Sequence, residues 1–186
     1  MKKFKGFPLV LFSFVLGVSL MTGCSTGATE SGEQAVTAES DNAEATLYGA
    51  SAAFEDQEMT VEEMLIYAIQ DEYLAHGEYA YILDTFGDQN PFTNIIQAEE
   101  QHIVSLKVAF DANGYMAPED ISEDYLILPV SVEDALETGV EAEILNIQMY
   151  DLFLSKDLPD DVKLVFTALR DASENHLAAF RKKVGQ

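Results

Sequence analysis

Hydrophobic side chains between residues 60 and 184 recur at alternating spacings of three and four residues, in four successive stretches. This spacing places them along one face of an α-helix. The first stretch begins at Thr60, the second follows Pro91, the third follows Ser131 and the fourth follows Pro159. None of them shows the strict alternation of hydrophobic and polar residues that is typical of a strand. We therefore predict an all-α domain with four helices.

The residues at the ends of these stretches are typical of helix boundaries. The segment Thr60-Val61-Glu62-Glu63 has the pattern of a capping box, and Gly87 and Asp88 end the first stretch. Asn113-Gly114 is a typical end for the second. The connection over residues 115–130 is longer and contains two prolines. Short first and third connections with a long middle one predict two helical hairpins that close into an antiparallel four-helix bundle.

The two predicted hairpins resemble each other in sequence. An offset of 71 residues relates one glutamate-tyrosine pair to another, and an offset of 74 relates two short segments that end in histidine. The matching residues are Glu72 with Glu143, Tyr79 with Tyr150, and Glu100-Gln101-His102 with Glu174-Asn175-His176. A repeated hairpin would place equivalent side chains around a pseudo-twofold axis in the core.

The N-terminus has the features of an export signal. Residues 1–5 are basic, residues 7–21 are mostly apolar, and the run ends in Leu20-Met21-Thr22-Gly23-Cys24. This ending resembles a lipobox, although Met21 replaces the usual aliphatic residue. We predict a lipoprotein signal peptide over residues 1–23 and a lipid on Cys24. The alternative is a membrane anchor with an incidental cysteine.

The prediction for the N-terminus divides the chain into three parts. Residues 24–58 are rich in Ser, Thr, Gly, Ala and Glu, which predicts a flexible acidic tether. Residues 59–186 would form the folded domain, held at a membrane surface in the cell envelope by the lipid. Cys24 is the one cysteine of the chain, which excludes an internal disulfide, a four-cysteine zinc site and a rubredoxin-type iron site.

Charge narrows the choice of partners. The chain has 33 Asp and Glu residues against 10 Lys and Arg, a formal net charge of -23. Removal of residues 1–23, which contain three lysines and no acidic residue, would change this to -26. Such a surface repels phosphate backbones and argues against nucleic acid as a partner. It favours metal ions or basic partners, unless it serves solubility alone.

Five polar residues interrupt the hydrophobic faces of the predicted helices: Glu72, Glu99, His102, Glu143 and His176. Buried Glu and His require compensating partners. Glu99 and His102 are three residues apart, so both point from one helix face toward the same place. Carboxylates and imidazoles from four helices suit iron or manganese. The alternative is a polar network that satisfies itself across the bundle without metal.

These residues and their order resemble the ferritin-like superfamily, which includes ferritins and rubrerythrins. Within it, the chain is most similar to an uncharacterised domain family of bacterial and archaeal proteins. The resemblance covers residues 60–183. It is carried by Glu72-Tyr73-Leu74-Ala75 with Tyr79, by Phe92-Thr93-Asn94-Ile95 leading to Glu99 and His102, and by Ser173-Glu174-Asn175-His176-Leu177-Ala178-Ala179-Phe180. The resemblance implies the metal ligands Glu72, Glu99, His102, Glu143 and His176.

One position departs from the ferritin-like pattern. A second Glu-x-x-His would require glutamate at position 173, where this chain has Ser173. Five of six expected ligands remain, and one or two ions are both compatible with that set. His76, one turn beyond Glu72, could fill a vacant position or hydrogen-bond a ligand. Tyr79 and Tyr150 are expected in the core, with hydroxyls that reach a carboxylate.

These observations lead to one expected function and two alternatives. The expected function is a membrane-anchored ferritin-like protein with a carboxylate and histidine site for one metal ion or for a di-iron pair. An oxidoreductase of this kind would oxidise iron or reduce oxygen or peroxide, with electrons from an external donor. The alternatives are a non-enzymatic module that binds metal ions or a partner, and a metal-free structural bundle. The sequence leaves the metal, the substrate and the oligomeric state open.

Overall fold

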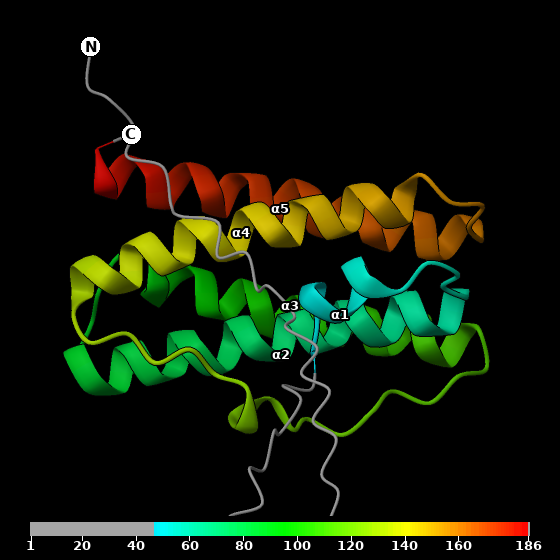
Figure 1. The fold of residues 1–186 in the computed structure, drawn as a ribbon, viewed down its shortest axis with the longest axis horizontal. Coiled ribbons are helices and arrows are strands. Elements are labelled where there is room, and N and C mark those ends of the chain that lie inside the picture. The colour runs from blue at the N-terminus through cyan, green and yellow to red at the C-terminus, as the bar shows by residue number, and fades with distance from the viewer. Residues whose placement is uncertain (1–46, 186) are drawn as a thin grey trace, which may run out of the picture. The chain divides into compact units, whose positions relative to one another are not determined.

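A computed structural model describes residues 47–185, and all regular secondary structure in these residues is helical (Figure 1). No strand occurs among them, which confirms the predicted all-α fold. The predicted signal peptide, Cys24 and residues 24–46 of the predicted tether lie outside the described residues. The elements are α1 (Ala50–Glu55), α2 (Val61–Phe86), α3 (Phe92–Ala112), a 3₁₀ turn η1 (Ser122–Asp124), α4 (Val132–Leu154) and α5 (Asp160–Val184).

Side chains fix the starts of α2 and α4. Thr60 Oγ1 accepts a hydrogen bond from the Glu63 backbone N–H at 3.3 Å, and Glu63 Oε2 accepts one from the Thr60 N–H at 2.7 Å. Ser131 Oγ likewise accepts from the Asp134 N–H at 3.1 Å. Each pair satisfies N–H groups that the first helical turn leaves without partners. At α3 the cap position is Pro91, with no side-chain hydrogen bond.

The four long helices form two hairpins that lie against each other. Helix α2 pairs with α3 and α4 pairs with α5, while α2 also packs on α4 and α3 on α5 (Figure 1). Two separate hydrophobic clusters fill the space between them. One contains Phe110, Phe153 and Phe166, and the other contains Phe92 and Phe180. The segments between these clusters, at mid-height of every long helix, carry most of the buried polar residues.

Helices α4 and α5 approach each other closely in the second hydrophobic cluster. A Cβ atom at Gly139 of α4 would lie 2.8 Å from a ring carbon of Phe180 in α5. Glycine therefore permits the buried Phe180 ring to lie directly against the α4 backbone. The resulting tight contact holds this end of the second hairpin together.

The folded part begins earlier than the sequence predicted. Residues 47–58, assigned to the tether, include α1, and Tyr48, Ala50 and Ala53 are buried. The Ala50 N–H donates to Asp71 Oδ1 of α2 at 2.9 Å. The Tyr48 ring stacks on Tyr125 with a centroid distance of 4.4 Å. Small residues that give this segment the composition of a linker also let α1 pack closely on α2 and α4.

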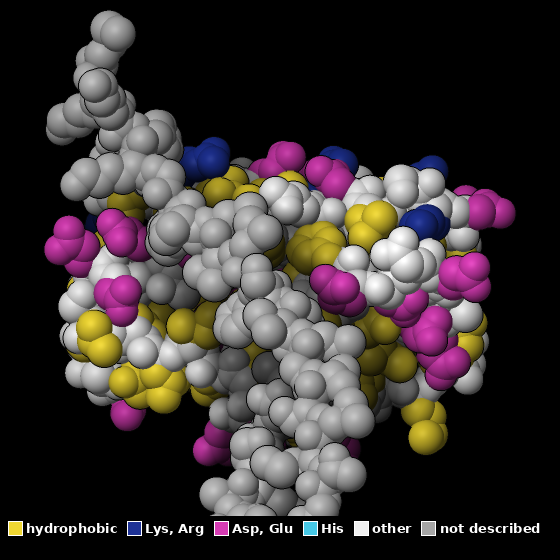
Figure 2. All heavy atoms as spheres, viewed as in Figure 1, with side chains coloured by type: hydrophobic (Ala, Val, Ile, Leu, Met, Phe, Trp, Pro, Cys, Tyr) yellow, Lys and Arg dark blue, Asp and Glu magenta, His cyan; other side chains and the backbone are white. Residues whose placement is uncertain are grey.

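The surface of the domain is predominantly acidic. On the face shown in Figure 2, Asp and Glu side chains are spread widely, whereas Lys and Arg lie mainly along the edge formed by α5. Helix α5 carries five basic residues, three of them in its last turn, where they oppose the negative end of the helix dipole. Within residues 47–185, no helix is both long and apolar enough to cross a bilayer.

Candidate metal centre

Each long helix contributes at least one buried polar side chain at the level between the two hydrophobic clusters. Glu72 comes from α2, Glu99 and His102 from α3, Glu143 from α4 and His176 from α5. All five are buried, and Glu72 is 1% exposed. The heptad-like spacing of the helices brings these residues inward at one height. The structure therefore places all five predicted ligands in one cluster.

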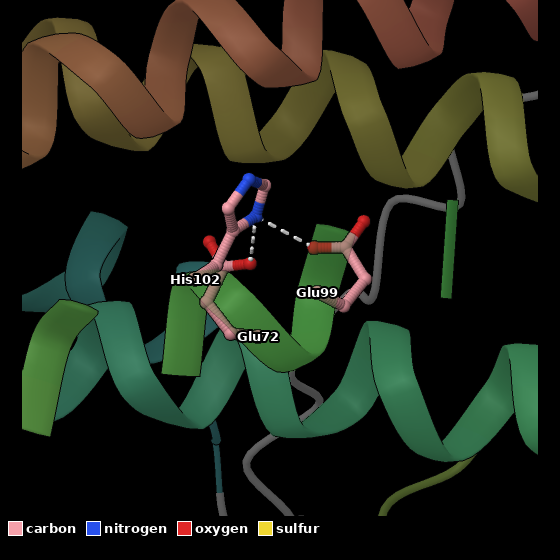
Figure 3. A group of neighbouring side chains, drawn as sticks. All are labelled: Glu72, Glu99 and His102. Carbon is pink, nitrogen blue, oxygen red and sulfur yellow. Dashed lines mark hydrogen bonds and ion pairs between the residues drawn. The ribbon is translucent and has the colours of Figure 1, made fainter. Parts of the chain in front are cut away.

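The cluster consists of two groups of three residues that share Glu99. In the first group, His102 Nδ1 lies 2.9 Å from Glu72 Oε2 and 2.8 Å from Glu99 Oε2 (Figure 3). In the second, His176 Nδ1 lies 3.1 Å from Glu99 Oε1 and 3.5 Å from Glu143 Oε1. One oxygen of Glu99 thus faces each imidazole.

The donor atoms fit a metal ion. In each group, one ligand atom per residue can be chosen so that all three lie within 4.8 Å of one another. His176 Nδ1 is buried, and no protein group is aligned with it for a hydrogen bond. His102 Nδ1 faces two carboxylate oxygens, yet a ring nitrogen carries at most one proton. A cation at each position would satisfy nitrogens and carboxylates together, so this buried group could hold metal.

Two tyrosines orient the outer carboxylates by reaching across between helices. Tyr150 Oη of α4 donates to Glu72 Oε1 of α2 at 2.6 Å. Reciprocally, Tyr79 Oη of α2 donates to Glu143 Oε1 of α4 at 2.9 Å. Both hydroxyls are in the core. The second oxygen of Glu72, Oε2, faces His102, whereas Glu143 Oε1 both accepts from Tyr79 and lies nearest His176. Such hydrogen bonds fix the position and basicity of metal-ligating carboxylates.

Ser173 takes part in a hydrogen-bond network that the sequence did not reveal. Its Oγ donates to Asn146 Oδ1 at 2.6 Å, and Asn146 Nδ2 donates to Asp71 Oδ2 at 2.8 Å. Asn146 Nδ2 also lies 3.4 Å from Glu72 Oε1. The signal in the sequence was the position of Asn146, three residues after Glu143 and therefore on the same face of α4.

His76 lies at the edge of the domain, away from the ligand group. Its Nε2 lies 3.6 Å from Glu100 Oε1, and its side chain is 32% exposed. Glu100 is itself a surface residue of α3. His76 therefore has a surface partner, and none of its recorded polar contacts involves the five clustered residues.

The pKa values of the clustered groups reflect burial and close contact. Burial lowers the pKa of His102, but its contacts with Glu72 and Glu99 outweigh that effect and raise it to about 10. The pKa of His176 rises to about 9 through Glu143 and Glu99, again against burial. Burial raises the pKa of Glu72 to about 8. Burial also opposes ionisation of Glu99, yet interactions with both imidazoles lower its pKa to about 2. Protons and metal ions therefore compete for the same atoms.

A cavity of about 280 Å³ connects the cluster with the protein surface. It lies between α2 and α4, and residues 47–51 and the middle connection also line it. Glu72, Glu99, Glu143 and Ser173 contribute to its wall at the level of the cluster. Small molecules and ions could therefore approach the carboxylates from this side.

Comparisons with known proteins give the fold but no family. No protein-family model matches the chain, and no curated protein matches it. A solved structure, of a hypothetical protein from Methanococcus jannaschii DSM 2661, is similar with a TM-score of 0.61 and 22% sequence identity. The match covers 70% of this chain and 83% of that chain. At this identity the similarity concerns the helical fold alone.

Proposed function

We propose that this protein is a metal-binding protein of the ferritin-like type, with two adjoining metal positions inside a four-helix bundle. The observation that carries the proposal is the sharing of Glu99 between two buried Glu/His groups. Further support comes from the similar hairpins, from the order of glutamates and histidines along the chain, and from the two-by-two packing of the long helices. Carboxylate oxygens with one imidazole per position suit iron or manganese.

Each residue has a role in this proposal. Glu72 and His102 hold one position, Glu143 and His176 hold the other, and Glu99 contributes an oxygen to both. The two hydrophobic clusters border the site above and below, and the cavity leads to its carboxylates from the side of α2 and α4. Bound iron or manganese ions would supply the redox chemistry. Fe²⁺ as substrate would give its electrons to oxygen or peroxide. Reduction of oxygen or peroxide without Fe²⁺ as substrate would need an external donor, because the single cysteine excludes a rubredoxin-type centre.

We also propose that the chain is exported, cleaved before Cys24 and attached to a membrane through a lipid on that cysteine. Support comes from the basic start, the apolar run and the residues before Cys24. Two acyl chains secure stable anchoring where one does not. Mass spectrometry of protein extracted from membranes should find lipidated Cys24 as the first residue. A Cys24→Ala variant that stays equally membrane-bound would contradict this proposal.

Iron oxidation tests the redox function. The purified full-length protein should oxidise added Fe²⁺ faster than buffer does, with oxygen consumption that matches the iron oxidised. Glu99→Gln should lose this activity, since it removes a charged ligand from both positions. Glu100→Gln is the matched control, because Glu100 is the next residue but is exposed. Metal binding without any iron oxidation would instead favour a non-enzymatic metal-binding module.

A further inference from the structure

The pseudo-twofold relation between the hairpins identifies a position in the cluster that lacks a carboxylate. The reciprocal contacts of Tyr150 with Glu72 and of Tyr79 with Glu143 show that the relation holds in space as well as in sequence. The offset that relates His102 to His176 relates Glu99 to Ser173. Ser173 therefore occupies the position at which a second shared carboxylate would lie.

The cavity reaches this same position. Ser173 is 2% exposed and lines the cavity together with Glu72, Glu99 and Glu143. A serine side chain lacks the carboxylate arm of glutamate, and Asn146 occupies only part of the space. A molecule in the cavity can therefore place a carboxylate of its own where the protein provides none.

Charge favours an anion at this position once metal is bound. In the proposed centre, two divalent ions face the three carboxylates of Glu72, Glu99 and Glu143, which leaves one positive charge within this group. Asp71 lies outside the group and accepts hydrogen bonds from the Ala50 N–H and from Asn146 Nδ2. An uncompensated charge in a buried site is costly. A single carboxylate from a ligand would neutralise it, as a glutamate at position 173 would have done.

The size and lining of the cavity suggest the rest of the ligand. A volume of about 280 Å³ is far larger than oxygen or peroxide require, and corresponds to roughly nine water molecules. Apolar groups of Leu74, Ala142 and Leu145 contribute to its wall. Glu141, an exposed residue, also lines it and disfavours any second negative charge on the ligand.

We propose that the cavity binds a small organic monocarboxylate. Its carboxylate lies beside Ser173, in the place of the sixth carboxylate of the centre, and its apolar part lies along the wall formed by α2 and α4. This inference rests on the proposed metal centre, because the carboxylate of the ligand would take the place of a metal-binding glutamate and has that role only when metal is bound.

Hexanoate is a suitable probe of this site. The full-length protein is first loaded with Co²⁺, and its metal content and visible absorption spectrum are measured. Hexanoate should then change the Co²⁺ spectrum saturably and give binding heat in calorimetry. Hexylamine, which carries the opposite charge, and adipate, which carries a second carboxylate, should bind at least about tenfold more weakly. The metal-free protein should not bind hexanoate.

Two variants separate the ligand site from the metal site. Ser173→Glu supplies the missing carboxylate, and Ala142→Phe fills the cavity without changing a ligand. Both should keep Co²⁺ but bind hexanoate at least about tenfold more weakly. Ala80→Phe, on the exposed side of α2, is the control and should bind hexanoate normally.

The possible outcomes are distinguishable. Co²⁺ uptake without any response to hexanoate, or a preference for hexylamine, would overturn the monocarboxylate proposal and leave the metal centre intact. Hexanoate binding that survives in both Ala142→Phe and Ser173→Glu would place the ligand elsewhere and would also overturn it. Failure of the wild-type protein to take up Co²⁺, Fe²⁺, Mn²⁺ or Zn²⁺ would overturn the metal centre, and this proposal with it.

Discussion

The two hairpins contribute similar residues to the centre, but they do not contribute equally. The α2–α3 hairpin supplies Glu72, Glu99 and His102, whereas α4–α5 supplies Glu143 and His176 and has Ser173 in place of a third Glu or His residue. The contacts differ accordingly. His102 Nδ1 has two carboxylate oxygens within 2.9 Å, while those nearest His176 Nδ1 lie at 3.1 and 3.5 Å.

This difference makes Glu99 the residue on which both groups of the cluster depend. Because Ser173 has no carboxylate, Glu99 alone is shared by the two groups, with one oxygen directed to each histidine. The group of three residues on the α4–α5 side therefore includes this carboxylate of the other hairpin. We therefore expect the two metal positions to differ in affinity and to fail together when Glu99 is changed.

The largest expected effect is that of Glu99→Gln. It removes the shared carboxylate charge while keeping the size of the side chain, so both metal positions should be lost. Metal analysis by plasma mass spectrometry and circular dichroism on the same samples measure binding and folding. Glu100→Gln should bind metal as the wild type does. A Glu99→Gln protein that folds and still holds two ions would show that the hairpins do not depend on this residue.

A smaller effect is expected when only one position is changed. Glu143→Gln removes a ligand from the α4–α5 side, so one ion should remain at the side of Glu72 and His102. In Glu72→Gln, the remaining ion should instead lie at the side of Glu143 and His176, and it should be held more weakly than in the wild type. Titration with Co²⁺, followed by absorption, counts the ions bound. Equal loss of both ions in Glu143→Gln would contradict two separable positions.

The pH dependence of stability provides a third test. The raised pKa values of about 10 for His102, about 9 for His176 and about 8 for Glu72 mean that the folded, metal-free protein retains protons that the unfolded chain releases. Stability from these groups is therefore lost as pH rises from about 4.5, where Glu72 ionises in the unfolded chain, to about 10, where His102 loses its proton in the folded protein. Stabilisation by metal should increase over this range, because protons compete less. Urea unfolding with and without Zn²⁺ at several pH values measures both quantities. If stability with and without Zn²⁺ changed in parallel with pH, protons and metal would not compete for the cluster.

The smallest expected effects are those of the two tyrosines. Tyr150→Phe and Tyr79→Phe each remove one hydrogen bond to a buried carboxylate, at a cost of about 2 kcal/mol in the free energy of unfolding. The shorter bond of Tyr150 should make its loss the larger of the two. Tyr67→Phe is the control for metal affinity, because Tyr67 donates to Asp56, outside the cluster. If Tyr67→Phe weakens metal binding as much as Tyr150→Phe does, the hydrogen bonds of Tyr79 and Tyr150 have no specific role in holding the glutamates in place.

The sequence predicted the helices and the inward carboxylates and imidazoles well because both follow from helical periodicity. The prediction failed where tertiary packing decides. Helix α1 has six residues, too few to show a periodic stripe. His76 follows Glu72 by four residues, which rotates it about 40° further around the helix, and it faces Glu100 instead of the cluster. The role of Asn146 depends on Ser173 and Asp71, which are brought near it only by packing of α4 on α5 and α2.

Metal stoichiometry tests the central claim most directly. The full-length protein, purified without a metal-binding tag, is offered Fe²⁺, Mn²⁺ and Zn²⁺ separately, dialysed and analysed for metal per chain. The account predicts two ions of at least one of these metals per chain in the wild type, bound with unequal affinity, and none in Glu99→Gln. A wild-type protein that is folded, takes up none of the three metals and keeps its melting temperature in chelator would contradict it. In that case the five residues form a self-satisfied polar core.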